Sequence, residues 1–353
     1  MDLLGARMNN TTVAPPWKDH INNWSSATEN NFENQTWVKA LYGMIAVLGI
    51  PGNFMVCLVV WKVKSMHTLT NHFIVSLACA DTIASVFMLP LHLGIPISIP
   101  ENVSGDVLCS LMLSKFPLWA TFSASVLNLT CVTLERYFAI VHPFKYHVAF
   151  TSARAKYMIA LVWVVAIFSM SFMFYIFRNA DGFCVLVWPS IAFRRLTGIW
   201  IFFVVYFGPL MVMAYAHREM MSSLRNPIQD GQNVQSLEIL EARRRLVKVL
   251  ATVVVTFTIC WTPNQVLYLA YSFGSHVDFT SWYYHLTVLL AFMNSCVNPF
   301  IYAFKSEKYR EALRIALGFA NAVTPTSPNE MPDVAPNRAH RAPESQVTSI
   351  EQA

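Results

Sequence analysis

The stretch FPLWATFSASVLNLTCVTLERY, residues 116–137, decides the fold of this chain. Residues 116–134 carry no charged side chain, and Glu135 and Arg136 then follow side by side. About 20 apolar residues are enough for a helix to cross a bilayer. A charge costs less at the end of such a helix than at its centre, so a charged pair there marks a membrane face. The stretch therefore predicts a membrane-spanning helix that ends in Glu135-Arg136-Tyr137.

Six further stretches have the same character. They are residues 40–61, 73–98 with Asp81 as the single charge, 157–177, 196–216, 249–277 and 279–304. Of the 353 residues, 55% are hydrophobic and 13% are charged, whereas a soluble domain has about 25% charged residues. A soluble protein with a large core would also show shorter apolar runs, broken by charges. We therefore expect an all-α membrane protein, a bundle of seven transmembrane helices.

The flanking segments complete the expected domain organisation. Residues 1–37 are predicted to form a glycosylated extracellular N-terminal tail, and residues 38–304 the bundle. Residues 320–353, rich in Pro, Ser and Thr, are predicted to form a disordered cytoplasmic tail. Between them, residues 305–319 carry apolar Ala312, Leu313, Ala316 and Leu317 at helical spacing. This spacing predicts a short amphipathic eighth helix along the membrane.

The loops indicate the orientation of the bundle. Lys and Arg are concentrated after the first, third, fifth and seventh spans, for example at Lys62, Lys145, Arg218 and Lys305. The positive-inside rule then places the N-terminus outside the cell, in a multi-pass protein of the plasma membrane. Five glycosylation sequons lie on the side assigned as outside, at Asn9, Asn10, Asn23, Asn34 and Asn102. Which of them carry glycans stays open.

Cysteines divide by depth in the membrane. Cys109 and Cys184 fall on the outer side, and the other five of the 7 cysteines lie inside spans. The exterior of a cell is oxidising, which favours a disulfide. We therefore expect Cys109 to pair with Cys184, although the sequence does not prove the pairing.

Asp81 is an acid in the middle of the second span, where a charge is expensive. Other polar side chains lie at comparable depth in the first, third and seventh spans: Asn53, Ser125, Asn294, Ser295 and Asn298. Their oxygen atoms suit a hard monovalent cation such as sodium. The alternative is a buried acid that its neighbours keep neutral. We expect an allosteric sodium ion at Asp81, Ser125, Asn294 and Asn298, and no other cofactor.

Pro90, Pro209, Pro263 and Pro299 fall inside apolar spans. Each removes a backbone hydrogen bond and is expected to kink its helix. Kinked helices have two packings of similar energy, as a conformational switch requires.

Motifs distributed one or two per span carry a family resemblance. They are Gly52-Asn53, Leu77-Ala78-Cys79-Ala80-Asp81, Glu135-Arg136-Tyr137, Trp163, Pro209, Phe257 with Cys260-Trp261-Thr262-Pro263, and Asn298-Pro299-Phe300-Ile301-Tyr302. Each motif is weak alone, but the ordered set is specific. Over residues 41–318 the chain resembles the rhodopsin-like, or class A, G-protein-coupled receptors.

The resemblance implies a switch at the inner face and a relay above it. Arg136 would pair with Glu135 at rest and be released on activation to meet a heterotrimeric G protein. The implied switch residues are Glu135, Arg136, Tyr137, Tyr302 and Phe144. The implied relay residues are Trp261, Phe257, Pro209, Val126, Pro263, Asn298 and Pro299. Phosphorylation of the C-terminal tail would recruit arrestin.

Two ligand classes are excluded by missing side chains. Amine receptors need a carboxylate in the outer half of the third span, but no Asp or Glu lies between Cys109 and Glu135. Opsins need a lysine in the seventh span, but none lies between Trp282 and Phe304. The chain looks most like the neuropeptide receptors of the family and, more loosely, like the galanin and allatostatin receptors.

Aromatic and polar residues at the outer ends are the candidates for the ligand pocket. They are Trp119, Gln265, Tyr268, Trp188, Tyr284 and His285, although an interfacial aromatic belt also accounts for Trp and Tyr at membrane ends. Residues 183–188 suit a hairpin rim to which an extended peptide adds backbone contacts. The alternatives are a class A receptor for a lipid or other small non-amine ligand and, more remotely, a membrane transporter. We expect neither an enzyme nor a nucleic-acid partner.

The third span departs from the family pattern. The interval from Cys109 to Arg136 is longer than the family usually shows. We therefore expect the outer end of this span to bulge, with Pro117 as the candidate position. The identity of the ligand, the G protein that couples and the oligomeric state stay open.

Overall fold

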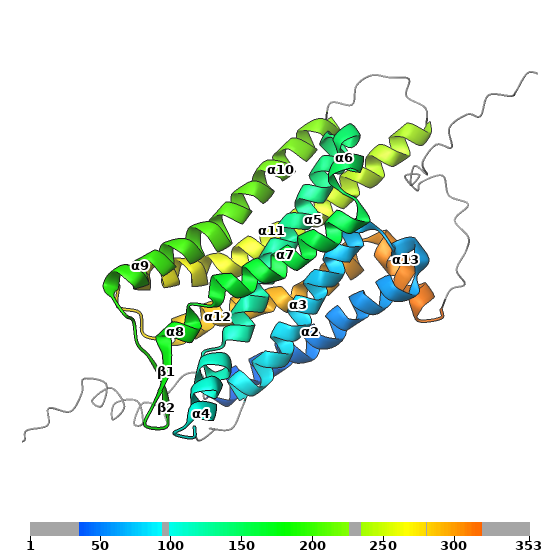
Figure 1. Ribbon diagram of the computed structural model, residues 1–353. Helices are drawn as coiled ribbons and strands as arrows, with labels where there is room; N and C mark the ends of the chain where they lie inside the picture. Colours follow the sequence, from blue (N-terminus) through cyan, green and yellow to red (C-terminus); the bar gives the residue numbers. More distant parts are fainter. Residues whose placement is uncertain (1–34, 94–98, 226–233, 280, 320–353) are drawn as a thin grey trace, which may run out of the picture.

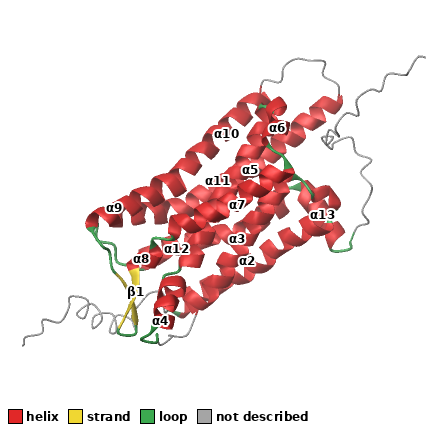
Figure 2. Ribbon diagram, viewed as in Figure 1, coloured by secondary structure: helices red, strands yellow, loops and turns green. Residues whose placement is uncertain are grey.

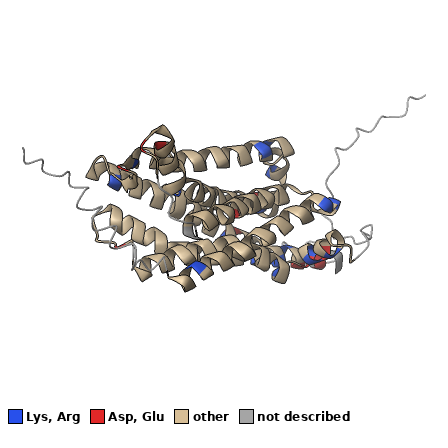
Figure 3. Ribbon diagram, turned by 90° about the horizontal axis from the view of Figure 1, so that it is seen from below, with Lys and Arg blue, Asp and Glu red and all other residues tan. Residues whose placement is uncertain are grey.

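The computed structural model describes residues 35–93, 99–225, 234–279 and 281–319. Within this part of the chain, seven helical segments are long and apolar enough to cross a membrane. They lie side by side in an elongated bundle, which contains few charged positions along its middle (Figures 1 and 3). The expected all-α seven-helix fold is confirmed. The two expected tails lie almost wholly outside the described residues, as do Asn9, Asn10, Asn23 and Asn34.

Apart from the first turns of the third span, which are described below, the seven spans are built from nine helices and a π-helical segment within the described residues. They are α2 (Thr36–Lys62), α3 (Leu69–Leu93), α5 (Phe116–Val141), α7 (Ser152–Met170) with α8 (Met173–Ile176), α9 (Ile191–Ile199) with η4 (Trp200–Phe207) and α10 (Gly208–Arg225), α11 (Val234–Ser272), and α12 (Trp282–Lys305). Three short helices connect or extend them: η2 (Lys64–Met66), α6 (Pro143–Ala149) and α13 (Glu307–Ala316). We name the two ends of the bundle after their landmarks, the hairpin end and the Arg136 end.

A β-hairpin projects from one end of the bundle (Figure 2). Strands β1 (Phe177–Ala180) and β2 (Phe183–Leu186) pair antiparallel. The two residues between them, Asp181 and Gly182, have φ of 51° and 79°. Positive φ at both central positions favours Asp-Gly and matches the twist of the strands. A hairpin is therefore present, but it spans residues 177–186, so only its second strand lies within the expected residues 183–188.

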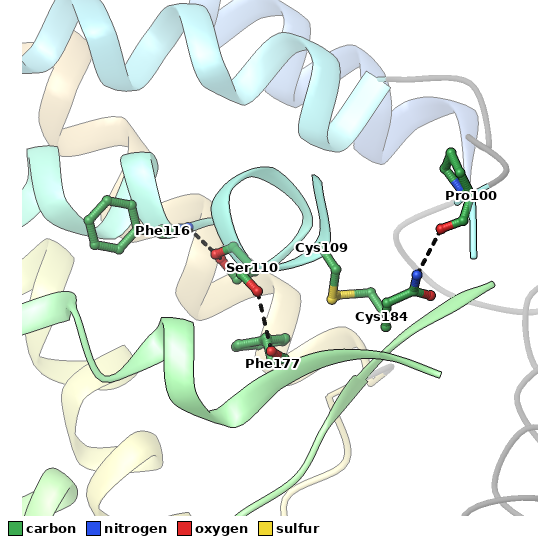
Figure 4. The surroundings of a disulfide bond; sticks show 8 residues. Pro100, Cys109, Ser110, Phe116, Phe177 and Cys184 are labelled. Carbon is green, nitrogen blue, oxygen red and sulfur yellow. Dashed lines mark hydrogen bonds between the residues drawn. A yellow bond between two sulfur atoms is a disulfide. The ribbon is translucent and has the colours of Figure 1, made fainter. Parts of the chain in front are cut away.

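A disulfide fastens the hairpin to the third span. Cys109 and Cys184 are bonded, with 5.3 Å between their Cα atoms, so the expected pairing is confirmed. The Ser110 hydroxyl donates to the Phe177 carbonyl at 3.4 Å, beside the disulfide (Figure 4). At the far end of β1, the Asn179 side-chain amide donates to the Pro100 carbonyl at 2.8 Å. The hairpin is therefore held to the bundle at three points.

The third span is broken near its hairpin end. It begins as α4 (Val103–Val107), continues as the π-helix η3 (Leu108–Leu113), and resumes as α5. Lys115, the residue before α5, is left-handed with φ of 63°. Pro117 lies in the first turn of α5, where a missing N–H costs nothing. A wide helical turn and the break before Pro117 take up the extra length that the sequence indicated.

The prolines lie where the sequence placed them. Pro90, Pro263 and Pro299 are inside α3, α11 and α12. Pro209 lies in the first turn of α10, directly after the π-helical η4. A π-helix contains wider turns than an α-helix, so it accommodates a residue whose N–H is missing.

The eighth helix is also confirmed. Ser306 caps α13, because its hydroxyl accepts from the Tyr309 N–H at 3.2 Å. Tyr309, Ala312 and Ala316 are buried and recur at helical spacing on one face. Burial raises the pKa of the Tyr309 phenol to about 12. Lys62 of α2 donates to the Ala316 carbonyl at 3.3 Å, which ties α13 to the bundle.

Candidate functional site

A buried carboxylate organises the Arg136 end. Glu135 is fully buried, and its two oxygens accept from Arg136 Nε and Nη2, each at 2.5 Å. The Thr70 hydroxyl of α3 donates to Oε2 at 2.8 Å, and the Tyr146 hydroxyl of α6 donates to Oε1 at 2.7 Å. A buried charge is tolerable only when it is paired and hydrogen-bonded, which this arrangement achieves. Arg136 is thereby held in a bidentate pair, with its side chain 12% exposed.

The other expected switch residues make separate contacts. The Tyr137 hydroxyl lies 3.0 Å from His142 Nε2. Tyr302 is buried and packs against Tyr309 of α13, with 6.1 Å between ring centroids. Phe144 of α6 is 95% exposed.

A second polar cluster lies around Asp81, deep in the bundle. The carboxylate is fully buried and accepts from the Ser125 hydroxyl at 2.8 Å and from the Asn298 side-chain amide at 3.0 Å. Asn294 Oδ1 is buried and forms no hydrogen bond within the described part of the chain, whereas the buried Ser295 hydroxyl interacts with the Asp81 carboxylate. Helices α3, α5 and α12 thus bring together the residues that the sequence proposed for sodium. Carboxylate, hydroxyl and amide oxygens are the ligands that a hard cation prefers.

A stack of rings joins the hairpin end to the middle of the bundle. Trp261 of α11 contacts Phe122 of α5 edge to face, with 5.0 Å between centroids, and Phe257 lies one turn below at 6.1 Å. Tyr206 of η4 packs on Phe257 at 5.9 Å, and its hydroxyl lies 2.5 Å from the Thr262 hydroxyl. Such rings couple α5, η4 and α11, because edge contacts are specific in orientation.

The expected relay residues lie on helices α5, α10, α11 and α12. Val126 and Pro209 are buried in α5 and α10, while Pro263, Asn298 and Pro299 lie on α11 and α12. Sequence reasoning missed Phe122 and Tyr206. Phe122 stands four residues before Val126, hence on the same helix face, and this spacing could have identified it. For Tyr206 the sequence offered no comparable signal.

A cavity of about 610 Å³ opens above Trp261 toward the hairpin end. All six expected pocket residues line it: Trp119, Trp188, Gln265, Tyr268, Tyr284 and His285. Cys184 and Leu186 of β2 also line it, so the hairpin forms part of its wall. The Trp188 indole N–H donates to the Tyr271 hydroxyl at 2.8 Å, which joins the segment after β2 to α11. The cavity is of the size that small-molecule and peptide-end sites have.

Two buried polar atoms of this cavity have no hydrogen-bond partner within the described residues. They are Gln265 Oε1 and Trp261 Nε1, on side chains 6% and 4% exposed. Leaving a buried donor or acceptor unpaired is costly, by about 1–3 kcal/mol each. Unpaired groups in a lined cavity point to a ligand that completes them. The floor of the cavity therefore offers one hydrogen-bond donor and one acceptor to an incoming polar group.

Sequence reasoning also missed Lys39 and Lys115, which line the cavity. Lys39 stands in the first turns of α2, and Lys115 immediately precedes α5. Both looked like ordinary charges at a membrane face. The remaining described sequon residue, Asn102, is exposed and caps α4 by accepting from the Gly105 N–H at 3.2 Å.

Comparison with known proteins agrees with this architecture. The pattern of the family described as 7 transmembrane receptor (rhodopsin family) matches residues 52–302. The chain is 29% identical over 326 residues to galanin receptor 2a of Danio rerio, covering 90% of this chain and 85% of that protein. It is 27% identical over 318 residues to the pyroglutamylated RF-amide peptide receptor of Rattus norvegicus, covering 82% and 71%. It is 29% identical over 333 residues to the substance-K receptor of Homo sapiens, covering 88% and 82%. The chain therefore belongs to the rhodopsin family of seven-transmembrane receptors, which are signalling proteins and not enzymes.

Proposed function

We propose that this chain is a receptor for an extracellular peptide and that it activates a heterotrimeric G protein. The observation that carries the proposal is the cavity above Trp261, with its unpaired Gln265 Oε1 and Trp261 Nε1. A peptide group has one N–H and one C=O, so it can complete both atoms at once. The relatives named above are receptors for galanin, RF-amide peptide and substance K, which supports a peptide over other ligands.

The proposal includes an orientation. The hairpin end, with the disulfide and the Asn102 sequon, faces the outside of the plasma membrane, so the N-terminus is extracellular. The supporting observations are the loop charges, which favour the opposite end as cytoplasmic, and the disulfide, which an oxidising compartment favours.

Activation in this proposal releases Arg136 from Glu135. The bidentate pair and the hydrogen bonds from Thr70 and Tyr146 describe a resting arrangement. A peptide that binds above Trp261 favours another packing of the ring stack only if it binds that packing more tightly. Movement of α11 would then uncover Arg136 for the G protein, and exposed Phe144 would add an apolar contact.

Sodium is proposed as an allosteric ion of the resting state. Asp81, Ser125, Asn294 and Asn298 would hold it, since together they supply one negative charge and several oxygens. The ion would neutralise the buried carboxylate. Asp81→Asn should make the potency of an activating peptide independent of sodium concentration, whereas an unchanged sodium dependence would remove the ion from this site.

Arrestin is a further proposed partner. Thr324, Thr326, Ser327, Ser345, Thr348 and Ser349 supply phosphorylation positions in the C-terminal tail. These positions lie outside the described residues. A receptor truncated after Phe319 should lose stimulated arrestin recruitment while its nucleotide exchange persists.

The test is a screen of the full-length chain in cells, read by nucleotide exchange on co-expressed G proteins. One set of wells receives synthetic peptides, and a second receives lipids and small non-amine acids. The proposal expects responses to peptides that untransfected cells do not show. Responses confined to the second set would favour the alternative, a receptor for a lipid or other small non-amine ligand. If no compound alters nucleotide exchange and vesicles that contain the chain accumulate a solute, the remote alternative of a membrane transporter would be favoured.

A further inference from the structure

Tyr206 of η4 stands between the cavity and helix α11. It is 4% exposed and is one of the residues that line the cavity. Its ring packs on Phe257 with 5.9 Å between centroids, and its hydroxyl lies 2.5 Å from the hydroxyl of Thr262. Thr262 follows Trp261 and precedes Pro263 in α11. A residue of the cavity wall is therefore joined to α11 at the turn that the proline interrupts.

The protons of the two hydroxyls determine the direction of this contact. The Thr262 hydroxyl donates to the Thr258 carbonyl at 2.6 Å. A threonine hydroxyl has one proton and two acceptor lone pairs. The Tyr206 hydroxyl is therefore the donor, and Thr262 Oγ1 accepts from it. The hydrogen bonds form a chain from Tyr206 to the backbone of α11, and successive bonds in such a chain strengthen one another.

The backbone is irregular at both ends of this bridge. Tyr206 lies in the π-helix η4, which ends directly before Gly208 and Pro209. In α11, Pro263 has no N–H to donate to the Ile259 carbonyl, one turn earlier. Prolines and π-helical turns are the places at which helices bend. The bridge therefore joins two segments that are suited to a change in packing.

We infer that the Tyr206–Thr262 hydrogen bond restrains α11 in the resting packing and that an occupant of the cavity releases α11 by displacing Tyr206. The inference rests on the proposed function, because it assigns the regulation of the same site. Apolar contacts such as that with Phe257 are non-directional and tolerate sliding. A hydrogen bond of 2.5 Å is instead lost after a displacement of about 1 Å. Movement of α11 away from η4 breaks the bridge, so the bridge favours the packing in which Arg136 is paired.

The first experiment measures nucleotide exchange without added ligand, in cells that express the full-length chain and G proteins. Exchange is divided by the amount of receptor at the surface, measured with an N-terminal epitope tag. Tyr206→Phe removes the donor and keeps the ring, and Thr262→Val removes the acceptor at similar shape. Each should raise ligand-free exchange by about 2- to 10-fold, the factor that one net hydrogen bond represents. A purely structural role would lower the surface amount without raising exchange per receptor.

Matched variants test whether the bridge itself is responsible. Thr262→Ser keeps the accepting oxygen and should exchange like the wild type. Thr258→Val removes a hydroxyl that donates to the Val254 carbonyl of its own helix at 2.8 Å, so it should also leave exchange unchanged. The double variant of Tyr206→Phe and Thr262→Val should not exceed the larger single effect, because both substitutions remove the same bond.

Melting temperatures of the purified variants test the bridge without a G protein. In Tyr206→Phe, the Thr262 hydroxyl keeps its bond to the Thr258 carbonyl. In Thr262→Val, the buried Tyr206 hydroxyl loses its acceptor, which is the more costly change. Thr262→Val should therefore lower the melting temperature further than Tyr206→Phe does, and adding Tyr206→Phe to it should restore part of the loss. Additive falls in the double variant would overturn the bridge.

Peptides that activate the wild type should be more potent on both bridge variants. The gain should not exceed the rise in ligand-free exchange, because the occupant is spared only the free energy of breaking the bridge. Unchanged or lower potency on Tyr206→Phe and Thr262→Val would contradict the release of α11 through Tyr206.

The outcomes separate the inference from the function on which it rests. If one bridge variant does not reach the surface, the other breaks the same bond and decides the result. Unchanged or lower ligand-free exchange by the bridge variants, while peptides activate the wild type, would overturn the inference alone. No exchange by any form of the chain, together with no response in the peptide screen, would count against the proposed function and the inference together.

Discussion

The two ends of the bundle treat buried polar groups in opposite ways. At the Arg136 end, the Glu135 carboxylate is fully buried, yet Arg136, Thr70 and Tyr146 all donate to it. At the hairpin end, Gln265 Oε1 and Trp261 Nε1 are buried without a partner in the described part of the chain. A satisfied cluster resists change, and an unsatisfied one gains free energy from whatever completes it. The comparison indicates that the Arg136 end stabilises one conformation of the bundle, whereas the hairpin end offers hydrogen-bonding groups to a ligand.

The two ends of the bundle also differ in how regular the backbone of the third span is. The Arg136 end of the third span is continuous α-helix to Val141. Its hairpin end contains the π-helix η3 and left-handed Lys115. Irregular backbone within a membrane is tolerated where it lines a cavity or is buried in protein. The irregular segment here lies at the wall of the 610 Å³ cavity.

The largest expected effect comes from breaking the satisfied cluster. Arg136→Ala removes both hydrogen bonds of the bidentate pair and the cation proposed to meet the G protein. Stimulated nucleotide exchange should be lost, while binding of an activating peptide at the other end persists. Lys156→Ala, an exposed cation of α7, is the control and should exchange normally. Equal exchange by the Arg136 variant and the wild type would refute the assigned switch.

Removing the disulfide should have the next largest effect, confined to the hairpin end. The bond closes a loop with a sequence separation of 75 residues, for which chain entropy predicts about 4 kcal/mol. Cys184→Ala should lower the thermal stability of the purified receptor and weaken peptide binding, because β2 lines the cavity. Cys109→Ala should match it, and the double variant should add nothing. Cys79→Ala, which removes an exposed free thiol, serves as control.

A matched pair of substitutions sharpens the contrast between the ends. Thr70→Val removes a donor from Glu135 and should destabilise the receptor by about 1–3 kcal/mol, seen as a lower melting temperature. Gln265→Leu removes an acceptor that has no partner, so the melting temperature should stay level or rise. The same variant should weaken activation by peptides. A similar fall in melting temperature for both variants would contradict the contrast.

The smallest expected effect concerns an exposed contact at the Arg136 end. Arg245 of α11 pairs with Glu307 of α13 at 2.9 Å, with side chains 61% and 68% exposed. Exposed pairs contribute about 0.2–1 kcal/mol. Glu307→Gln should therefore raise basal exchange by less than about fivefold, since the pair restrains α11. Exchanging the two charges should restore the wild-type level, and Glu311→Gln on the same helix should change nothing.

Much of the fold was accessible from the sequence, because the bilayer imposes its own pattern. Uninterrupted apolar stretches predict spans regardless of packing. The hairpin was expected at residues 183–188, whereas the turn at Asp181 and Gly182 places it at residues 177–186. The sequence motifs already predict that Asp81, Ser125 and Asn298 form one cluster. The residues missed were those whose role depends on contact. Phe122 and Tyr206 look like ordinary apolar and aromatic positions until Trp261 and Phe257 are packed against them.

The sequence by itself therefore determined that this protein spans a membrane seven times, which residues gather around Asp81 and where prolines interrupt its helices. Those properties follow from local hydrophobicity and from backbone chemistry, both of which depend on residues that are close together in the sequence. Only the tertiary structure decided that Glu135 accepts four hydrogen bonds from three residues, that Gln265 Oε1 and Trp261 Nε1 lack partners among the described residues, and that Lys115 lines the cavity. These depend on which helices meet and at what rotation. Hydrogen-bond satisfaction is a property of pairs of atoms, and a linear sequence does not specify those pairs.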